Sequence, residues 1–268
     1  MPTKPPTASD FPPHLTLTIT PPQTPSSNPT RPPPNLLLLL HGIGDTSATF
    51  STFGRALNLP ETTVLTLQAP AHLPFDLPGY HWGDDISFDP TTGALDMDAG
   101  FARTTRTLVD EVIRDILVKR CGYKLREIMI LGFGQGGMVG LAAARELGIR
   151  PKVQDVGGEG EGEGGSSSAF GELSGVISIG APYPVSGSVV GGKSRTPVLL
   201  VAGRDSGVVS DGAEKRTRGV FEFVEVARYA RKGDGMPKSR EEMLPIMRFL
   251  ARRLRSWQGV PEGSVEIA

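Results

Sequence analysis

The sequence predicts a single α/β domain: a mostly parallel central sheet with helices on both faces. Residues 35–40 read Asn-Leu-Leu-Leu-Leu-Leu, which is typical of a strand covered on both faces. Short apolar segments of this kind recur along the chain, and most of them alternate with helical patterns. A glycine-rich stretch, residues 132–137, follows one such segment and opens a helix. The 268 residues are enough to bury a substantial core without disulfides or metals.

The strands are predicted from two patterns of hydrophobicity. Residues 15–20 alternate apolar and polar side chains, as in a half-buried strand, whereas residues 35–40 indicate an inner strand. The same short apolar signal predicts further strands at residues 64–67, 127–131, 176–179, 198–201 and 220–226.

Three helices are predicted from apolar stripes and end signals. The first spans about residues 98–119, and the second runs from 136 or 137 to about 147 and stops at Gly148. Ser239 and Glu242 form a capping box for the third. One face of this last helix carries Met243, Ile246, Met247, Leu250, Leu254 and Trp257.

The segments outside these elements differ in composition. Residues 1–34 are rich in proline and are expected to form an extended leader before a domain at residues 35–258. Residues 153–170 are mostly Gly, Glu and Ser, and we expect a disordered surface insertion there. Residues 259–268 are a tail. A polyproline ligand and an acidic partner-binding loop are the alternative interpretations of the leader and the insertion.

Charge and cysteine content exclude several classes of protein. A formal net charge of −1 offers no basic field, so no nucleic-acid partner is expected. Cys121 is the single cysteine, which excludes an internal disulfide and a cysteine-rich metal cage and fits a cytoplasmic or nuclear protein. The longest purely apolar run, residues 36–40, is too short to span a bilayer. Neither a cofactor nor a metal is expected.

The glycine-rich stretch Gly132–Gly137 has the spacing of a nucleophile elbow, the strained strand-to-helix turn that exposes a serine in the pattern G-x-S-x-G. Gly134 occupies the position of that serine. The same residues also satisfy G-x-G-x-x-G, the dinucleotide-binding fingerprint. That fingerprint opens the first strand–helix unit of its fold, whereas this stretch follows several elements, so the elbow is the preferred interpretation.

Further motifs point to one family. His41–Thr46 follows an apolar strand, and its glycines allow a turn that aims backbone N–H groups into a cavity, as in an oxyanion hole. With Gln68–Pro70, Trp82–Asp85 and Gly203–Val208, these motifs resemble the phospholipase/carboxylesterase branch of the α/β-hydrolase fold, which includes acyl-protein thioesterases. The resemblance covers about residues 35–256 and implies an acyl ester or thioester as ligand.

The resemblance also implies roles for residues around the elbow. The N–H groups of Ile43 and Gln135 would form the oxyanion hole, and His41 and Trp82 would lie beside the pocket. A histidine at the end of a strand is also often a hydrogen-bonded structural group, which is the preferred interpretation of His41.

The catalytic triad implied by the resemblance is incomplete. Gly134 replaces the nucleophile, Asp205 occupies the position of the acid, and the missing histidine is placed at Met236. The fold orders its triad as nucleophile, acid and histidine, but all four histidines precede the elbow: His14, His41, His72 and His81. Asp234, the titratable group between Gly233 and Gly235, is a poor substitute for a base of near-neutral pKa.

The leading hypothesis is therefore a pseudoenzyme that keeps the fold and a ligand pocket but lacks serine-hydrolase chemistry. One alternative is an active ester hydrolase with a rearranged mechanism based on Asp205, Asp234 or His81. A second alternative is an interaction scaffold that binds a protein partner through residues 1–34 or 153–170.

Overall fold

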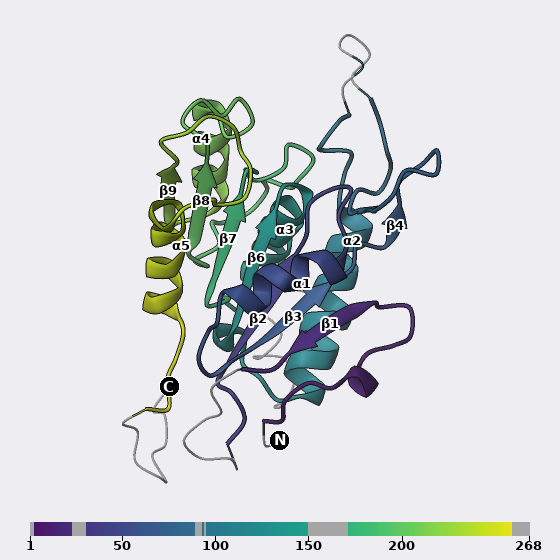
Figure 1. Cartoon of the computed structure of the whole chain (residues 1–268), viewed down its shortest axis with the longest axis vertical. Helices are drawn as coiled ribbons and strands as arrows, with labels where there is room; N and C mark the ends of the chain where they lie inside the picture. The colour runs from purple at the N-terminus through teal and green to yellow at the C-terminus, as the bar shows by residue number, and fades with distance from the viewer. Residues whose placement is uncertain (1–2, 23–30, 89–92, 94, 150–170, 259–268) are drawn as a thin grey trace, which may run out of the picture.

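A seven-stranded sheet forms the centre of the protein. The computed structural model describes residues 3–22, 31–88, 93, 95–149 and 171–258; the insertion and the tail predicted at residues 153–170 and 259–268 lie outside the described residues. The strand order is β1-β3-β2-β6-β7-β8-β9, with β1 antiparallel to β3 and every other pair parallel (Figure 1). The predicted α/β class with a mostly parallel sheet is confirmed.

The strands match most of the predicted segments. They are β1 (Leu17–Thr20), β2 (Asn35–Leu40), β3 (Thr62–Leu67), β6 (Ile128–Phe133), β7 (Gly175–Ile179), β8 (Val198–Ala202) and β9 (Val224–Arg228). A separate pair consists of β4 (Ala71–His72) and β5 (Tyr80–His81). The last strand begins four residues later than predicted, because Val220 ends a helix and Phe221 follows it as a fully buried cap.

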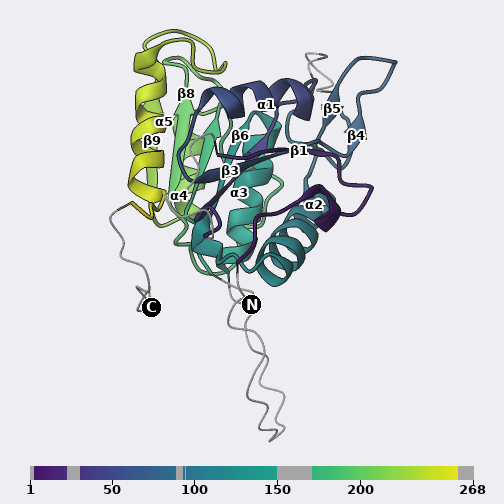
Figure 2. The same ribbon diagram turned by 60° about the horizontal axis from the view of Figure 1, so that its bottom comes forward.

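Helices cover both faces of the sheet, as Figure 2 shows. On one face lie α1 (Ser47–Ala56) and α5 (Arg240–Arg253). The other face carries α2 (Ala102–Arg106), which continues as the π-helical segment η2 (Thr107–Arg120), together with α3 (Gln135–Gly148) and α4 (Asp211–Val220). Two short 3₁₀ turns complete the elements, η1 (Ala8–Asp10) and η3 (Leu125–Glu127).

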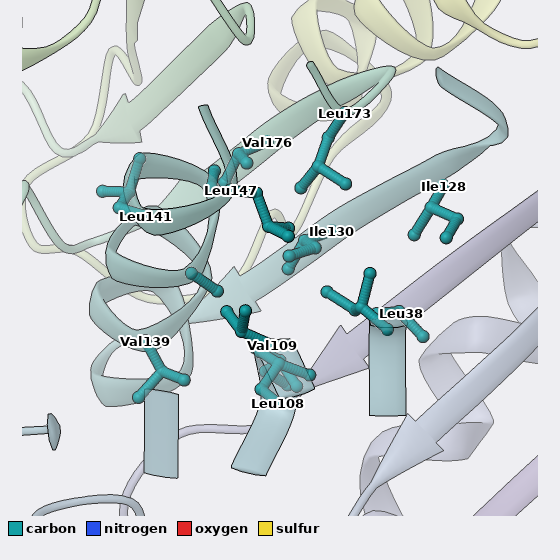
Figure 3. Close-up of a cluster of buried hydrophobic side chains, with 14 of the residues drawn as sticks. Leu38, Leu108, Val109, Ile128, Ile130, Val139, Leu141, Leu147, Leu173 and Val176 are labelled. Atoms are coloured by element: carbon teal, nitrogen blue, oxygen red, sulfur yellow. The ribbon is translucent and has the colours of Figure 1, made fainter. Parts of the chain in front are cut away.

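Two buried clusters join the sheet to these helical layers. Along β2, Leu36, Leu38 and Leu40 belong to one cluster while Leu37 and Leu39 belong to the other, because successive side chains of a strand point to opposite faces. Figure 3 shows the first cluster, where strand side chains meet Val139 and Leu141 of α3 and residues of η2. This double burial explains why β2 has no polar alternation.

Two helices differ from the prediction in their bounds, and two others were not predicted. The first begins at Ala102 rather than 98, and α5 ends at Arg253, so Trp257 lies beyond the helix. The sequence patterns did not predict α1 or α4. In α4 only Ala213, Thr217 and Val220 are buried, which is too weak an apolar stripe to stand out.

Residues 3–22 pack against the sheet and its helices. Strand β1 pairs with β3 along the edge of the sheet, and Phe11 is buried in the core cluster. Lys4 N–H donates to the Cys121 carbonyl oxygen at 2.9 Å. Apolar and backbone contacts with distant residues therefore hold residues 3–22, part of the predicted leader, in place.

The Asp10 carboxylate anchors the turn formed by residues 4–10, and its substitution by asparagine is expected to destabilise the protein above about pH 4. The Lys4 ammonium, 2.5 Å from Oδ1, and the N–H and hydroxyl of Thr7 lower the pKa of Asp10 to about 2 from the ordinary 3.8. A lowered carboxyl pKa contributes stability that is complete above the unfolded pKa and is lost as the pH falls from about 4 to about 2. We expect a cost of about 1–2 kcal/mol for Asp10→Asn at pH 7.

Urea unfolding at pH 7 and at successive lower pH values tests this expectation. The curves of the wild type and Asp10→Asn should converge as the pH approaches 2. Asp115→Asn is the control, because Asp115 and Lys119 form an exposed i,i+4 pair whose loss should cost less than about 0.5 kcal/mol. An equal loss in both variants would contradict the anchoring role of Asp10.

The order of the strands positions the site. Strand β2 lies between β3 and β6, so the chain first continues to β3 on one side of β2 and later adds β6 on the other side. Ligands of open α/β sheets bind outside the carboxyl ends of the strands at such a switch point. Gly42 and Gly134 follow β2 and β6 at this position. In the part of the chain that the structure describes, no helix is long and apolar enough to cross a membrane.

Candidate functional site

The turn between β6 and α3 has the backbone of a nucleophile elbow. Gly134 lies between Phe133, the last residue of β6, and Gln135, the first residue of α3, with φ 53° and ψ −123°. L-residues adopt this region only under strain. Gly134 N–H donates to the Ile179 carbonyl oxygen at 3.0 Å, and the Gly134 carbonyl oxygen accepts from Gly137 and Met138 N–H. Hydrogen bonds from both sides therefore hold the turn in this conformation.

The glycines around the turn differ in how much space the surrounding atoms leave for a side chain. A Cβ at Gly132 would lie 2.3 Å from the Gly136 carbonyl oxygen, and one at Gly136 would lie 2.3 Å from that of Leu40. A Cβ at Gly134 would meet only Met97 Cε at 3.8 Å and Gly42 Cα at 3.9 Å among the described residues within 4 Å. Close backbone packing requires glycine at positions 132 and 136, whereas position 134 has room for a side chain.

The loop after β2 faces the elbow with a free backbone donor. Gly42 approaches the side-chain position of Gly134, and Gly44 N–H donates to the Tyr80 carbonyl oxygen at 2.9 Å. Among the described residues, the N–H groups of Ile43 and Gln135 have no hydrogen-bond acceptor. Two free backbone donors therefore lie on the two turns that meet at the carboxyl edge of the sheet.

The His41 imidazole has hydrogen-bond partners at both ring nitrogens. Its Nδ1 lies 2.7 Å from the Gly42 carbonyl oxygen and therefore carries the proton, while Nε2 accepts from Ala69 N–H at 3.0 Å. Gln68 Nε2 lies 3.1 Å from the same Nε2. Burial lowers the pKa of His41, so the ring is neutral. Both ring nitrogens are thus occupied, and the imidazole is not available as a base.

Trp82 and Gln135 link the loop after β2 to the elbow. Trp82 Nε1 donates to the His41 carbonyl oxygen at 2.7 Å, and its backbone N–H donates to Gln135 Oε1 at 3.1 Å. Both side chains are almost completely buried. Gln135 Nε2 lies 3.4 Å from the Met97 carbonyl oxygen. The structure therefore brings four of the predicted site residues together: Ile43, His41, Trp82 and Gln135.

Asp205 and the loop that carries Met236 form a second group. Asp205 Oδ1 accepts from Gly233 N–H at 3.1 Å, and the Lys232 ammonium lies 3.8 Å from Oδ2. The Asp205 side chain is 46% exposed. Met236 packs against the hydrophobic cluster on the α1/α5 face. Neither residue is within 4 Å of the position of a Gly134 Cβ, so the structure pairs Asp205 with this loop but not directly with the elbow.

Asp234 has a structural role that the sequence patterns did not indicate. Its Oδ1 accepts from Gly203 N–H and its Oδ2 from the Ser206 hydroxyl, both at 2.8 Å. Gly180 follows Ile179, whose carbonyl oxygen accepts from Gly134 N–H. A Cβ at Gly180 would lie 3.1 Å from Asp234 Cβ. Asp234 therefore holds residues 203–206 and lies over the ends of β7 and β8. In the sequence, the glycines on either side of Asp234 were the feature that could have indicated this role.

His81 is the one buried histidine with a free ring nitrogen in the described part of the chain. Its side chain is nearly buried, and Nδ1 has no hydrogen-bond partner among the described residues. Burial, and then the charge of Arg103, lower its pKa. It precedes Trp82, whose N–H binds Gln135, so its backbone lies close to the elbow.

Comparison with known proteins agrees with this geometry. A model of the phospholipase/carboxylesterase family matches residues 26–150. An uncharacterized hydrolase of Schizosaccharomyces pombe is 28% identical over 226 residues, which cover 82% of this chain and 83% of that protein. The crystal structure of esterase PE8 has a TM-score of 0.63 at 20% identity and covers 90% of this chain and 99% of its own.

Zea mays acyl-protein thioesterase 2 has a TM-score of 0.56 at 18% identity and covers 90% of this chain and 99% of its own. At such identities the two solved structures show a shared fold. The family match includes both β2 with its following loop and the elbow. The chain therefore has the α/β-hydrolase fold, and its residues 26–150 match the phospholipase/carboxylesterase family.

Proposed function

We propose that this protein is a catalytically inactive relative of the phospholipases/carboxylesterases that retains a binding site for the acyl carbonyl group of an ester or thioester. The observation that carries the proposal is the glycine at position 134 in an otherwise preserved elbow. The turn has the strained backbone conformation and the room for a serine side chain, but position 134 supplies no hydroxyl. No covalent acyl-enzyme can form at this position.

The lack of a histidine at the triad position supports the same conclusion. The resemblance places the triad histidine at position 236, and methionine cannot accept a proton. His41 is occupied at both ring nitrogens. Loss of the serine or the histidine of a triad costs roughly a millionfold in rate, about as much as loss of the whole triad. With both positions changed, only the contribution of binding and backbone donors is left.

The retained function would depend on backbone groups. The N–H groups of Ile43 and Gln135 have no acceptor among the described residues, and oxyanion-hole donors of this kind need no serine side chain. A carbonyl or carboxylate oxygen bound between the loop after β2 and the elbow would satisfy them. Gly134 leaves space at the same point.

The purified wild-type protein is expected to show no enzymatic turnover of p-nitrophenyl butyrate or of a short acyl thioester, and no covalent labelling by a fluorophosphonate. The reason is that neither nucleophile nor base is present at the elbow. Steady-state rates should equal those of the heat-denatured sample. Saturable turnover by the folded protein, or stoichiometric labelling, would refute the proposed inactivity.

One observation favours a second candidate function, an active hydrolase that uses His81 as a base for water. The buried Nδ1 of His81 has no partner among the described residues, and the lowered pKa keeps the ring in the neutral form that a general base requires. This candidate requires wild-type turnover that His81→Gln abolishes. Asp205→Asn and Asp234→Asn test the two carboxylates in the same assay, and unchanged rates in all three variants would eliminate the candidate.

A further inference from the structure

The side chain of Met97 lies beside the elbow. Among the described residues, and apart from the chain neighbours of Gly134, its Cε is one of two atoms within 4 Å of the position of a Gly134 Cβ, at 3.8 Å. The other is the Cα of Gly42, which has no side chain. Met97 is half-buried and packs against the first buried cluster. A ligand that occupies the space beside Gly134 therefore meets the thioether of Met97.

Hydrogen bonds fasten the start of the segment Leu95–Asp98, which we call the cover segment. Asp96 N–H donates to the Ser87 carbonyl oxygen at 2.8 Å, and the Ser87 hydroxyl donates to Asp96 Oδ2 at 3.1 Å. Leu95 forms an isolated antiparallel bridge with Phe88. The backbone just before Met97 is therefore tied to residues 87 and 88.

Asp98 fastens the other end of the cover segment to the loop after β7. Its carboxylate accepts from the N–H groups of Val185 and Ser186 and from the Ser186 hydroxyl. Hydrogen bonds to an ionised carboxylate are roughly twice as strong as those between neutral groups. The cover segment is thus held at both ends, and its backbone stays beside the elbow.

Met97 contacts the elbow through both its backbone and its side chain. Its carbonyl oxygen lies 3.4 Å from Gln135 Nε2, and its thioether methyl group borders position 134. The first contact belongs to the backbone that the two anchors fix. The second belongs to an unbranched side chain with three rotatable bonds, which can turn without moving the backbone. The structure therefore combines a fixed frame with a side chain that can move.

We propose that Met97 controls entry to the acyl-carbonyl site: its thioether covers position 134 in the ligand-free protein and turns away when a ligand binds. The cover segment stays in place during this change, because Asp96 and Asp98 hold it. The inference rests on the proposed function for the ligand, an acyl compound, but not for access to position 134. A smaller side chain at position 97 opens the site, and loss of the Asp98 carboxylate loosens the backbone around it.

A thiol introduced at the elbow measures access to position 134. Gly134→Cys is treated with iodoacetamide, and mass spectrometry gives the rate of alkylation, which depends on the exposure of the thiol. The wild type is the blank, because its single cysteine, Cys121, is completely buried and burial raises the pKa of that thiol. Adding Met97→Ala to Gly134→Cys should raise the rate about fivefold or more, whereas adding Met97→Leu, of similar size, should change it less than about twofold.

Three further variants distinguish this cover from a general loosening of the fold. Asp98→Asn should raise the alkylation rate of Gly134→Cys about twofold or more, whereas Asp115→Asn, in an exposed ion pair, should not. Met243→Ala changes a methionine that packs on the α1/α5 face and should also leave the rate unchanged. The proposal is overturned if Met97→Ala leaves the rate unchanged or if Met243→Ala raises it equally. An unchanged rate with Asp98→Asn would contradict the anchoring role of Asp98.

A carbonyl ligand separates this inference from the proposed function. 2-Decanone has an acyl-like carbonyl group and no leaving group, and it should slow alkylation when Gly134→Cys is combined with Met97→Ala. A lack of protection would contradict the proposed acyl-carbonyl site, while faster alkylation with Met97→Ala would still support control of access by Met97.

A second reporter serves if thermal unfolding shows that Gly134→Cys is not folded. Gly134→Ser combined with Met236→His places a hydroxyl at the same position. Its labelling by a fluorophosphonate should also accelerate when Met97→Ala is added, because the same thioether covers the hydroxyl. Equal labelling rates with methionine and alanine at position 97 would overturn the proposal.

Discussion

Serine at position 134 alone is expected to leave p-nitrophenyl butyrate turnover at the wild-type background, whereas Gly134→Ser combined with Met236→His should exceed that background at least about 100-fold. A serine hydroxyl is a weak nucleophile until a neighbouring base removes its proton. General-base catalysis contributes roughly 10² to 10⁴-fold. Position 134 has room for the side chain and the required backbone conformation, so the missing element is the base.

The pH dependence and covalent labelling identify the mechanism of the double variant. Its rate should rise with pH through about 6.5, because the histidine must be neutral to accept the proton. Fluorophosphonate should label the double variant but neither single variant. Efficient turnover by Gly134→Ser alone would contradict the prediction and would direct attention to His81. A folded but inactive double variant would contradict the placement of the histidine at position 236.

Alanine at Gly136 is expected to destabilise the protein by about 3 kcal/mol, the largest change in stability that we predict. Its Cβ would lie 2.3 Å from the Leu40 carbonyl oxygen and 2.5 Å from that of His41. These atoms belong to the end of β2 and cannot move without separating α3 from the sheet. Urea unfolding at neutral pH measures the difference in free energy from the wild type.

Two other glycine-to-alanine variants serve as matched controls. Gly134→Ala has room for the Cβ but retains a positive φ, so it should cost about 1–2 kcal/mol. At the exposed Gly219 in α4, an added Cβ meets no described atom within 4 Å, and Gly219→Ala should stabilise by about 0.5–1 kcal/mol. A loss for Gly136→Ala no larger than that for Gly134→Ala would contradict the steric argument.

The sequence alone predicted most of the sheet, because the evidence for a buried strand lies within a few consecutive residues. The run at 35–40 became β2 without a change of bounds, and the segment at 198–201 became β8 with one added residue. Helices with a strong apolar stripe, such as α3, were also predicted. Those with few buried residues, such as α4, were not, because their burial depends on contacts with distant elements.

The features of the site also divide into those that the sequence predicted and those that depend on the fold. The replacement of the nucleophile at Gly134 and the lack of any histidine after His81 are properties of residue order, which the sequence alone shows. The sequence also indicated that glycines surround the turn. It did not distinguish Gly136, which close packing requires, from Gly134, which has space, because that difference depends on the end of another strand.

Tertiary structure decided what the remaining polar groups do. In the folded chain, both ring nitrogens of His41 have hydrogen-bond partners, and the Asp205 carboxylate accepts from Gly233 N–H. Residues 17–20, within the segment at 3–22, pair with the edge of the sheet. The fold also brings the side chain of Met97 to the elbow at Gly134. The physical reason is that periodicity is a local property of the chain, whereas hydrogen-bond partners and cavities are formed by residues that only folding brings together.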